Sequence, residues 1–278
     1  MTMNKVFFGD CRDTMRYLIV RGVKVQMCVT SPPYYWQRDY GHAGQLGLEA
    51  TPAEYVAAMV EVFSLVRDLL EDDGVLWLNI GDTYNNRTRV RQSSHQPSMN
   101  GFKEESWAEA TKRGVTRLTV TCDNLKEKDL FGIPWAVAAA LRADGWFLRQ
   151  EVIWKKTFGK PEPTKDRMPC RHEHIFLLSK ASAYYFDRAA LPEWASDTVW
   201  QVPPTGSREH GAAFPSALIE PCIKAGSRPG DTVLDCFFGS GTTGEVAGNL
   251  GRNWIGCEIN DQYAPLQQAR TVQRGLAL

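Results

Sequence analysis

The sequence lacks a net charge, a long apolar run and a cysteine framework. Its 278 residues include 32 basic and 32 acidic side chains, so the molecule as a whole has no long-range attraction for a polyanion. No stretch approaches the roughly 18 consecutive apolar residues of a membrane helix, and the N-terminus has no apolar signal region. Seven cysteines without a Cys-x-x-Cys pair indicate reduced thiols. These absences predict a cytoplasmic protein that does not enter a membrane.

What is present is an alternation of short apolar runs with helical stretches, in a chain of 43% apolar residues. This pattern is typical of an α/β protein with a mostly parallel sheet, and the length suits a single domain spanning 1–278. Helices are expected at 52–70 and 134–143, each with a proline near its first turn. Seven strands are expected, at 6–8, 25–30, 75–80, 150–154, 174–178, 232–237 and 254–258.

Two polar segments interrupt this alternation. The first, 85–128, is a polar insert whose part 85–117 has a net charge of +4, and the second, 155–171, is a basic loop with three prolines and also +4. Because loops beyond roughly 12 to 15 residues are usually functional or disordered, we expect any nucleic-acid surface to lie on these two segments.

A glycine-rich turn follows the strand expected at 232–237. That strand contains Asp235, and Gly239-Ser240-Gly241-Thr242-Thr243-Gly244 leads from it into a helix through 250. This order lets the backbone approach a nucleotide closely and points a helix N-terminus at it. Glu258, nineteen positions after Gly239 and at the end of the next strand, can accept hydrogen bonds from ribose hydroxyls.

Three ligands compete for this turn. A triphosphate-binding Walker A loop requires Lys before the Ser or Thr, and this sequence has none there. A nicotinamide dinucleotide fits the glycine spacing alone. S-adenosylmethionine contains adenosine but no phosphate, and Asp235 favours it, because a carboxylate attracts the methionine ammonium and repels a pyrophosphate. We favour S-adenosylmethionine, with a dehydrogenase and a turn without a ligand as the alternatives.

A second motif, Thr30-Ser31-Pro32-Pro33-Tyr34, ends the strand expected at 25–30. Two consecutive prolines restrict the backbone and remove two N–H donors. In open α/β sheets, ligands bind at this end of the strands. The Ser31 hydroxyl, the Pro32 carbonyl and the Tyr34 ring would suit a planar ring that bears an exocyclic amine. The alternative is a proline turn whose aromatic side chains pack in the core.

Together the two motifs resemble the DNA amino-methyltransferases of the β group, which methylate exocyclic nitrogens with S-adenosylmethionine. The catalytic motif precedes the cofactor loop in that group, as it does here, and the resemblance extends to Gly9-Asp10-Cys11, His172-Glu173 and Phe214-Pro215. It implies a Rossmann-like class I methyltransferase fold, with a mostly parallel seven-stranded sheet, helices on both faces and a circularly permuted motif order.

The resemblance also assigns roles to residues. Asp10 would contact the adenine amine, Glu258 the ribose, and 235–243 the methionine portion, while Phe214-Pro215 would close the pocket. Ser31, Pro32, Pro33 and Tyr34 would form the catalytic site. The residues expected to bind the cofactor are Asp10, Cys11, Thr30, Phe214, Pro215, Asp235, Phe237, Gly239, Ser240, Gly241, Thr242, Thr243 and Glu258. Cys236 stands where the family usually has proline.

The expected reaction is methyl transfer to N4 of a cytosine flipped out of duplex DNA. In the family that the sequence resembles, serine at position 31 accompanies N4 of cytosine and aspartate accompanies N6 of adenine, so N6-adenine methylation is the alternative. Methylation of cytosine carbon 5 would require an activated cysteine, and Pro169-Cys170 lacks the rest of that pattern. Cys170, His172 and His174 offer three metal ligands without a fourth, so we expect no metal.

Double-stranded DNA is the expected partner. A cognate restriction endonuclease is a candidate second partner, and the protein is expected to be a monomer or a homodimer. The candidate DNA contacts are Arg38, Arg87, Arg89, Arg91, Lys112, Arg113, Lys156, Lys160, Lys165 and Arg167. A catalytically silent DNA-binding module would be expected to have lost Ser31, Tyr34, Asp235 or Glu258. A methyltransferase of RNA or of a small molecule would not need two basic segments.

Overall fold

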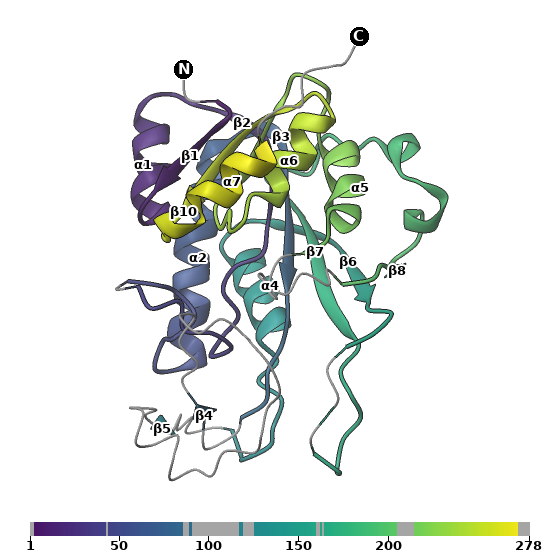
Figure 1. Ribbon diagram of the computed structural model, residues 1–278. Coiled ribbons are helices and arrows are strands. Elements are labelled where there is room, and N and C mark those ends of the chain that lie inside the picture. Colours follow the sequence, from purple (N-terminus) through teal and green to yellow (C-terminus); the bar gives the residue numbers. More distant parts are fainter. Residues whose placement is uncertain are drawn as a thin grey trace.

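An eight-stranded sheet with the strand order β1-β10-β9-β2-β3-β7-β6-β8 organises the chain (Figure 1). The computed structural model describes residues 3–42, 44–85, 89–90, 117–118, 125–159, 162, 164–204 and 214–271, with the backbone alone at 89–90 and 117–118. The strands of the sheet are β1 (Lys5–Phe8), β2 (Val25–Thr30), β3 (Leu70–Ile80), β6 (Phe147–Lys155), β7 (His172–Ser179), β8 (Val199–Gln201), β9 (Thr232–Asp235) and β10 (Asn253–Glu258). The helices are α1 (Cys11–Val20), α2 (Pro52–Leu69), α4 (Ile133–Ala143), α5 (Ser216–Gly226), α6 (Thr242–Asn249) and α7 (Ala264–Thr271), with short 3-10 turns at 188–190, 193–195 and 261–263.

The α/β class and the mostly parallel sheet are confirmed, and all seven expected strands are present. The sheet has eight strands rather than seven, because β8 pairs in parallel with β6 at one edge. Only three residues long, β8 is too short for its sequence pattern to indicate a strand. Strand β7 runs antiparallel to both of its neighbours, β3 and β6. The strand direction therefore reverses from β3 to β7 and reverses again from β7 to β6.

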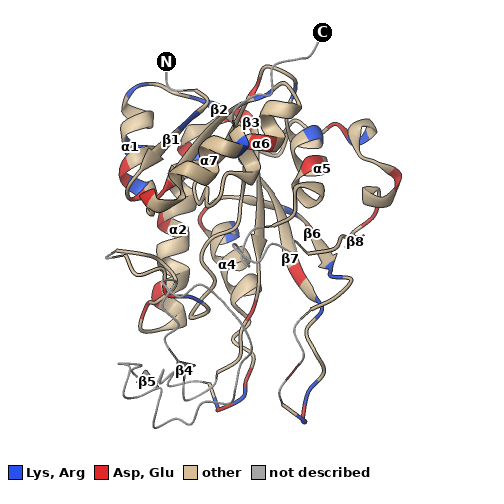
Figure 2. Ribbon diagram, in the orientation of Figure 1, with Lys and Arg blue, Asp and Glu red and all other residues tan. Residues whose placement is uncertain are grey.

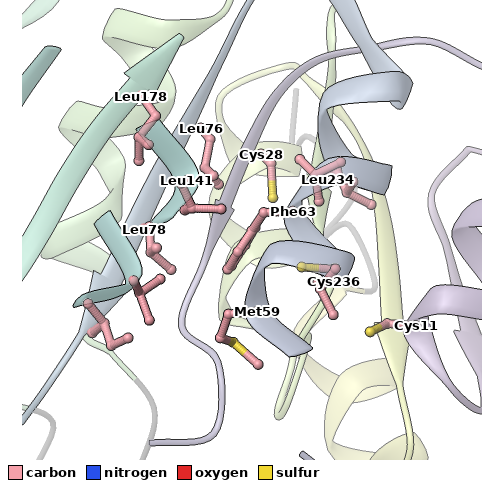
Figure 3. Close-up of a cluster of buried hydrophobic side chains, with 14 of the residues drawn as sticks. Cys11, Cys28, Met59, Phe63, Leu76, Leu78, Leu141, Leu178, Leu234 and Cys236 are labelled. Carbon is pink, nitrogen blue, oxygen red and sulfur yellow. The ribbon is translucent and has the colours of Figure 1, made fainter. Parts of the chain in front are cut away.

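Each face of the sheet buries its own layer of apolar side chains. Along β3, Leu76 and Leu78 join a cluster with α1, α2 and α4, whereas Val75 and Trp77 join a second cluster with α5 and α6. Figure 3 shows part of the first cluster, in which Phe63 of α2 lies among side chains from the sheet. Burial of an aromatic or aliphatic side chain contributes about 1.5–3 kcal/mol, so the two clusters together hold the helices on both faces.

The two predicted helices begin as their sequences indicate. Thr51 caps α2 in a reciprocal capping box with Glu54, and Pro52 occupies the first turn. Helix α4 begins at Ile133, after Gly132 in the left-handed region (φ 71°). Its first N–H groups are capped by Asp82, whose carboxylate accepts hydrogen bonds from Gly132 N and Ile133 N at 2.9 and 3.2 Å. The cap therefore comes from the segment after β3.

Strands β1 and β10 bring the two ends of the chain together. They pair in parallel, with Phe8 opposite Glu258, and Gly9 N donates to the backbone oxygen of Glu258 at 2.8 Å. The segment after β1 therefore lies beside the end of β10, which the sequence separates by some 250 positions.

The two ends of the polar insert at 85–128 lie next to each other. Asn85 exchanges backbone hydrogen bonds with Lys128 and Asp129 at 2.8 and 2.7 Å, and its side chain donates to the backbone oxygens of Leu125 and Lys126. Within the insert, β4 (Arg89–Val90) and β5 (Arg117–Leu118) pair as a separate antiparallel ribbon. The rest of the insert lies outside the described residues.

The six cysteines within the described ranges are free thiols, and five of them are buried. None of the described helices is long and apolar enough to span a lipid bilayer.

Candidate active site

The glycine turn lies at the C-terminal end of β9, as its sequence predicts. Gly239 and Gly241 adopt φ angles of 52° and 91°, which glycine tolerates without a steric penalty. Gly244, in the first turn of α6, leaves space that Phe238 occupies, since an added Cβ would lie 2.7 Å from the Phe238 Cζ atom. Phe238 stacks on Trp254 of β10. The turn is thus packed closely against the next strand.

Asp235 connects this turn to the Thr30–Tyr34 motif. Its buried carboxylate accepts hydrogen bonds from the hydroxyls of Thr30 and Thr243, each at 2.6 Å, and from Phe237 N at 3.0 Å. Burial raises the pKa of Asp235 to about 6, although these hydrogen bonds act in the opposite direction. The carboxylate therefore joins the end of β2, the glycine turn and the start of α6. The contact of Asp235 with the ammonium group of a bound methionine moiety stays a prediction.

Glu258 closes the other side of the turn. Its Oε2 accepts a hydrogen bond from Gly239 N at 2.7 Å and its Oε1 accepts one from Asn260 N at 2.8 Å. The side chain is only 8% exposed, and burial raises the pKa of Glu258 to about 7. Each oxygen keeps a second lone pair, so the carboxylate can still accept from a diol.

Asp10 caps α1 in a way that the sequence did not indicate. Its carboxylate accepts hydrogen bonds from the backbone and the guanidinium of Arg12, and these bonds lower the pKa of Asp10. Arg12 also pairs with Glu61 of α2 at 3.1 Å. Cys11, the first residue of α1, is buried. The predicted contact of Asp10 with an adenine amine would therefore share the carboxylate with Arg12.

The residues around the turn fit an adenosine that ends in an amino acid. The Ser240 hydroxyl is buried and has no hydrogen-bond partner among the described residues, so it offers a polar group to a ligand. Tyr40 and Tyr263 both lie near Glu258, and burial, together with that carboxylate, raises the pKa of both phenols. Arg38, predicted to contact DNA, lies with this group of residues.

Phe214 and Pro215 enter from a third part of the chain. Phe214 is 7% exposed and packs in the same apolar cluster as Phe238 and Trp254, and Pro215 stands immediately before α5. Thr242 opens α6 and accepts a hydrogen bond from the Arg270 guanidinium at 2.6 Å. Closure of the pocket by Phe214 stays a prediction.

Ser31, Pro32, Pro33 and Tyr34 follow β2 directly, and this segment is held by α2. The Tyr55 hydroxyl of α2 donates to the Pro33 backbone oxygen at 2.9 Å, and Trp36 adopts a left-handed conformation (φ 52°). The Trp36 N–H groups donate to the backbone oxygens of Gly47 and Glu49 at 2.7 and 2.6 Å. A non-glycine residue with this φ costs of order 1 kcal/mol, and these two hydrogen bonds offset that cost.

A hydrogen-bonded network surrounds Ser31 and Tyr34. Ser31 Oγ donates to the Tyr34 hydroxyl at 3.3 Å, and that hydroxyl donates to Glu173 Oε2 at 2.6 Å. Asn79 Nδ2 lies 2.5 Å from the Tyr34 hydroxyl and 2.9 Å from Glu173 Oε2. Burial and the Glu173 carboxylate raise the pKa of Tyr34. Lys156 forms an ion pair with the other oxygen of Glu173.

Sequence reasoning did not place Asn79 or Glu173 in this network. His172-Glu173 was part of the family resemblance, which was the available signal for Glu173, and no pattern indicated Asn79. Gly81 contributes space, since an added Cβ would lie 2.6 Å from the Tyr34 Cε2 atom. The Tyr34 ring therefore rests against a backbone that carries no side chain there.

The basic candidates for DNA contact have different surroundings. Lys156 is part of the network just described, whereas Arg167 pairs with Glu162 at 2.9 Å and lies over the Tyr84 ring at 3.7 Å. Lys165 is exposed. Figure 2 shows that basic residues recur along the loop between β6 and β7. Arg89 lies in β4, where only the backbone is described, and the remaining candidates, Arg87, Arg91, Lys112, Arg113 and Lys160, lie outside the described residues.

The possible metal ligands have other partners. His174 pairs with Glu151 of β6 at 2.6 Å, and Cys170 Sγ lies 3.4 Å from the backbone oxygen of His172. In the part of the chain that the structure describes, no group of three or more His, Cys, Asp or Glu side chains is arranged to hold a metal ion.

Comparison with known proteins agrees with this geometry. A family model described as DNA methylase matches residues 25–269. The Type II methyltransferase M.SmaI of Serratia marcescens is 42% identical over 97% of this chain and 91% of its own length, and M.Cfr9I of Citrobacter freundii is 40% identical over 94% and 85%. Among solved structures, the PvuII DNA methyltransferase, described as cytosine-N4-specific, superimposes with a TM-score of 0.69 at 19% identity, covering 98% of this chain and 88% of its own. A putative DNA modification methylase from Thermus thermophilus, solved with S-adenosyl-L-methionine, has a TM-score of 0.65 at 21% identity, covering 99% and 95%.

Proposed function

The chain belongs to the DNA methylase family, and we propose that, as a site-specific DNA methyltransferase, it methylates N4 of a cytosine flipped out of duplex DNA. The observation that carries this proposal is the hydrogen bond between Thr30 and Asp235 at 2.6 Å. It joins β2, which Ser31 follows directly, to β9, which the glycine turn follows. A base beside Ser31 and a ligand in the turn would therefore lie next to each other.

The residues of the turn suit S-adenosylmethionine as the cofactor. When bound, this cofactor supplies an electrophilic methyl group on a sulfonium. Glu258 would accept hydrogen bonds from its ribose hydroxyls. The Ser240 hydroxyl, which has no partner within the described part of the chain, would bond a polar group of its methionine part. Phe237, whose N–H is already bonded to Asp235, would line the turn between them.

Ser31 and its neighbours would make the exocyclic amine of the target base a better nucleophile. The lone pair of an exocyclic amine is delocalised into the base, which makes the nitrogen a poor nucleophile. Hydrogen bonds from its N–H groups to Ser31 Oγ and the Pro32 carbonyl would favour a pyramidal nitrogen and orient it. The Tyr34 ring, placed against Gly81, would stack on the flipped base.

Ser31 is the basis for choosing cytosine over adenine, because serine at this position accompanies N4-cytosine in the family that the sequence resembles. The relatives described above are Type II methyltransferases, so we infer a role beside a restriction endonuclease that reads the same site. The basic residues on the loop between β6 and β7 support duplex DNA as the partner.

A labelling experiment tests this proposal. Protein, S-adenosylmethionine with a labelled methyl group and unmethylated mixed-sequence duplex DNA are incubated, and the DNA is digested to nucleosides that are separated by mass. We expect label in N4-methylcytosine, and a loss of roughly 100-fold or more with Ser31→Ala. Label in N6-methyladenine would overturn the choice of base, and cofactor binding without label in DNA containing every six-base sequence would overturn the choice of substrate.

A further inference from the structure

Methyl transfer to an exocyclic amine leaves a proton that the amine must lose, and a hydrogen-bonded network lies around Tyr34 beside the proposed position of that amine. As the N4 lone pair forms the bond to the methyl carbon, the carbon–sulfur bond breaks and its electron pair stays on sulfur. The nitrogen then has one proton too many. A serine hydroxyl is too weak a base to keep that proton, so a second group must accept it.

The two hydroxyl donors in this network point the same way, while Asn79 Nδ2 donates to both hydroxyl oxygens from the side. Ser31 Oγ donates to the Tyr34 hydroxyl, which donates to Glu173 Oε2. A proton arriving on Ser31 Oγ can therefore displace the Ser31 proton to Tyr34 and the Tyr34 proton to the carboxylate. No hydroxyl has to ionise, which matters because burial and Glu173 raise the pKa of Tyr34.

Glu173 lies at the boundary between the buried network and solvent. Its side chain is 14% exposed, and Lys156, 23% exposed, forms an ion pair with the oxygen that Tyr34 does not use. The two oxygens of the Glu173 carboxylate thus have different partners, Tyr34 on one and Lys156 on the other. Asn79, on the neighbouring strand β3, donates to Glu173 at 2.9 Å and so holds it beside Tyr34.

We propose that Glu173 accepts the proton lost by the amine, through the hydroxyls of Ser31 and Tyr34. This inference rests on the proposed function, since it assumes a base whose amine meets Ser31. At the end of the transfer the product amine is neutral, both hydroxyls have their original number of protons, and Glu173 is a carboxylic acid that passes its proton to water.

The test compares Glu173→Gln with Tyr34→Phe and with the double variant. Glutamine keeps an oxygen that can accept from Tyr34, so the geometry is retained while the basic group is lost. Phenylalanine keeps the ring but breaks the path. With enzyme saturated by cofactor and duplex DNA, we expect each variant to lower the single-turnover rate of methyl transfer by about 100-fold or more. The double variant should be no slower than the slower single variant, because both changes interrupt one path.

Controls separate this role from a structural one. Glu220→Gln removes the carboxylate from another Glu–Lys pair, formed with Lys224 on α5, and should transfer at the wild-type rate. The affinity of Glu173→Gln for cofactor and DNA, measured by calorimetry, should stay within about threefold of wild type. Formate added to Glu173→Ala should restore part of the rate, because a small carboxylate can occupy the vacated position.

Three results would overturn the inference. They are transfer by Glu173→Gln within about twofold of wild type, multiplicative losses in the double variant, and no rescue by formate. Failure of the proposed function looks different, since the wild-type protein itself would then place no methyl group on N4 of cytosine in DNA.

Discussion

Glu258 couples the stability of the protein to pH through one carboxyl group. Burial raises the pKa of Glu258 to about 7, above roughly 4.3 for glutamate in an unfolded chain. The folded protein therefore keeps a proton that the unfolded chain releases. This contribution to the free energy of unfolding is complete below about pH 4 and is lost as the pH rises through about 7.

The variant Glu258→Gln isolates this effect. Between pH 5.5 and 8, the cofactor-free wild-type protein should lose roughly 2 kcal/mol more stability than the variant, which has no proton to release. Urea unfolding at the two pH values, followed by circular dichroism, measures the difference. Parallel losses in both proteins would contradict the assigned pKa shift. Asp235, whose pKa burial raises to about 6, remains in both proteins and cancels.

Gly81 determines where the Tyr34 ring lies. Because a Cβ at position 81 would come within 2.6 Å of the ring, Gly81→Ala should displace Tyr34 from Ser31 and Glu173. We expect methyl transfer to fall at least tenfold while cofactor affinity, measured by calorimetry, is retained, since the glycine turn lies on other strands. Wild-type transfer by this variant would show that the ring position is unimportant.

At the scale of a single element, α6 contains two glycines with opposite surroundings. An added Cβ at Gly244 would meet Phe238 Cζ at 2.7 Å and Thr271 Cγ2 at 2.9 Å, whereas at Gly248 it would meet nothing within 4 Å. Both residues lie in the same helix. Their contrast separates a packing requirement from helix propensity.

We therefore expect Gly244→Ala to lower the free energy of unfolding by roughly 1–3 kcal/mol through overpacking. Gly248→Ala should raise it by roughly 0.5–1 kcal/mol, because alanine is the better helix former. Denaturant titration of the two variants beside wild type gives both values. Equal changes in the free energy of unfolding at the two positions would show that the Phe238 side chain moves to accommodate the added methyl group.

The helices and strands differ in how far the adjacent residues determine them. The seven expected strands, the proline at the start of α2 and the glycine turn each follow from a few adjacent residues, and these were located correctly. The bounds of several strands were not, since β3 begins at Leu70 instead of position 75 and β9 ends at Asp235 instead of position 237. Strand β8 was missed because three residues carry no periodic signal. The cap of α4 was missed because Asp82 lies 50 positions before it in the sequence.

At the scale of the whole molecule, a net charge of zero makes DNA binding depend on local basic groups. Lys165 is exposed on the loop between β6 and β7, while Lys224 pairs with Glu220 on α5. If Lys165 contacts a phosphate, Lys165→Gln should reduce the slope of log K against log salt concentration by about 0.9. Lys224→Gln should leave the slope unchanged. Fluorescence anisotropy with duplex DNA at low and high salt measures both slopes, and identical slopes for all three proteins would exclude Lys165 from the interface.

Local sequence was sufficient to predict the α/β class, the seven main strands, the glycine turn and the position of Ser31 at a strand end, because each depends on neighbouring residues and on strand periodicity. The groups that meet across long sequence separations were set by the tertiary fold. Strand β7 runs antiparallel beside β3, with His174 opposite Ile80, and this register brings Glu173 to Tyr34. It also places Lys156, an expected DNA contact, in an ion pair with Glu173. Such pairings depend on strand order and direction, which no local pattern of residues specifies.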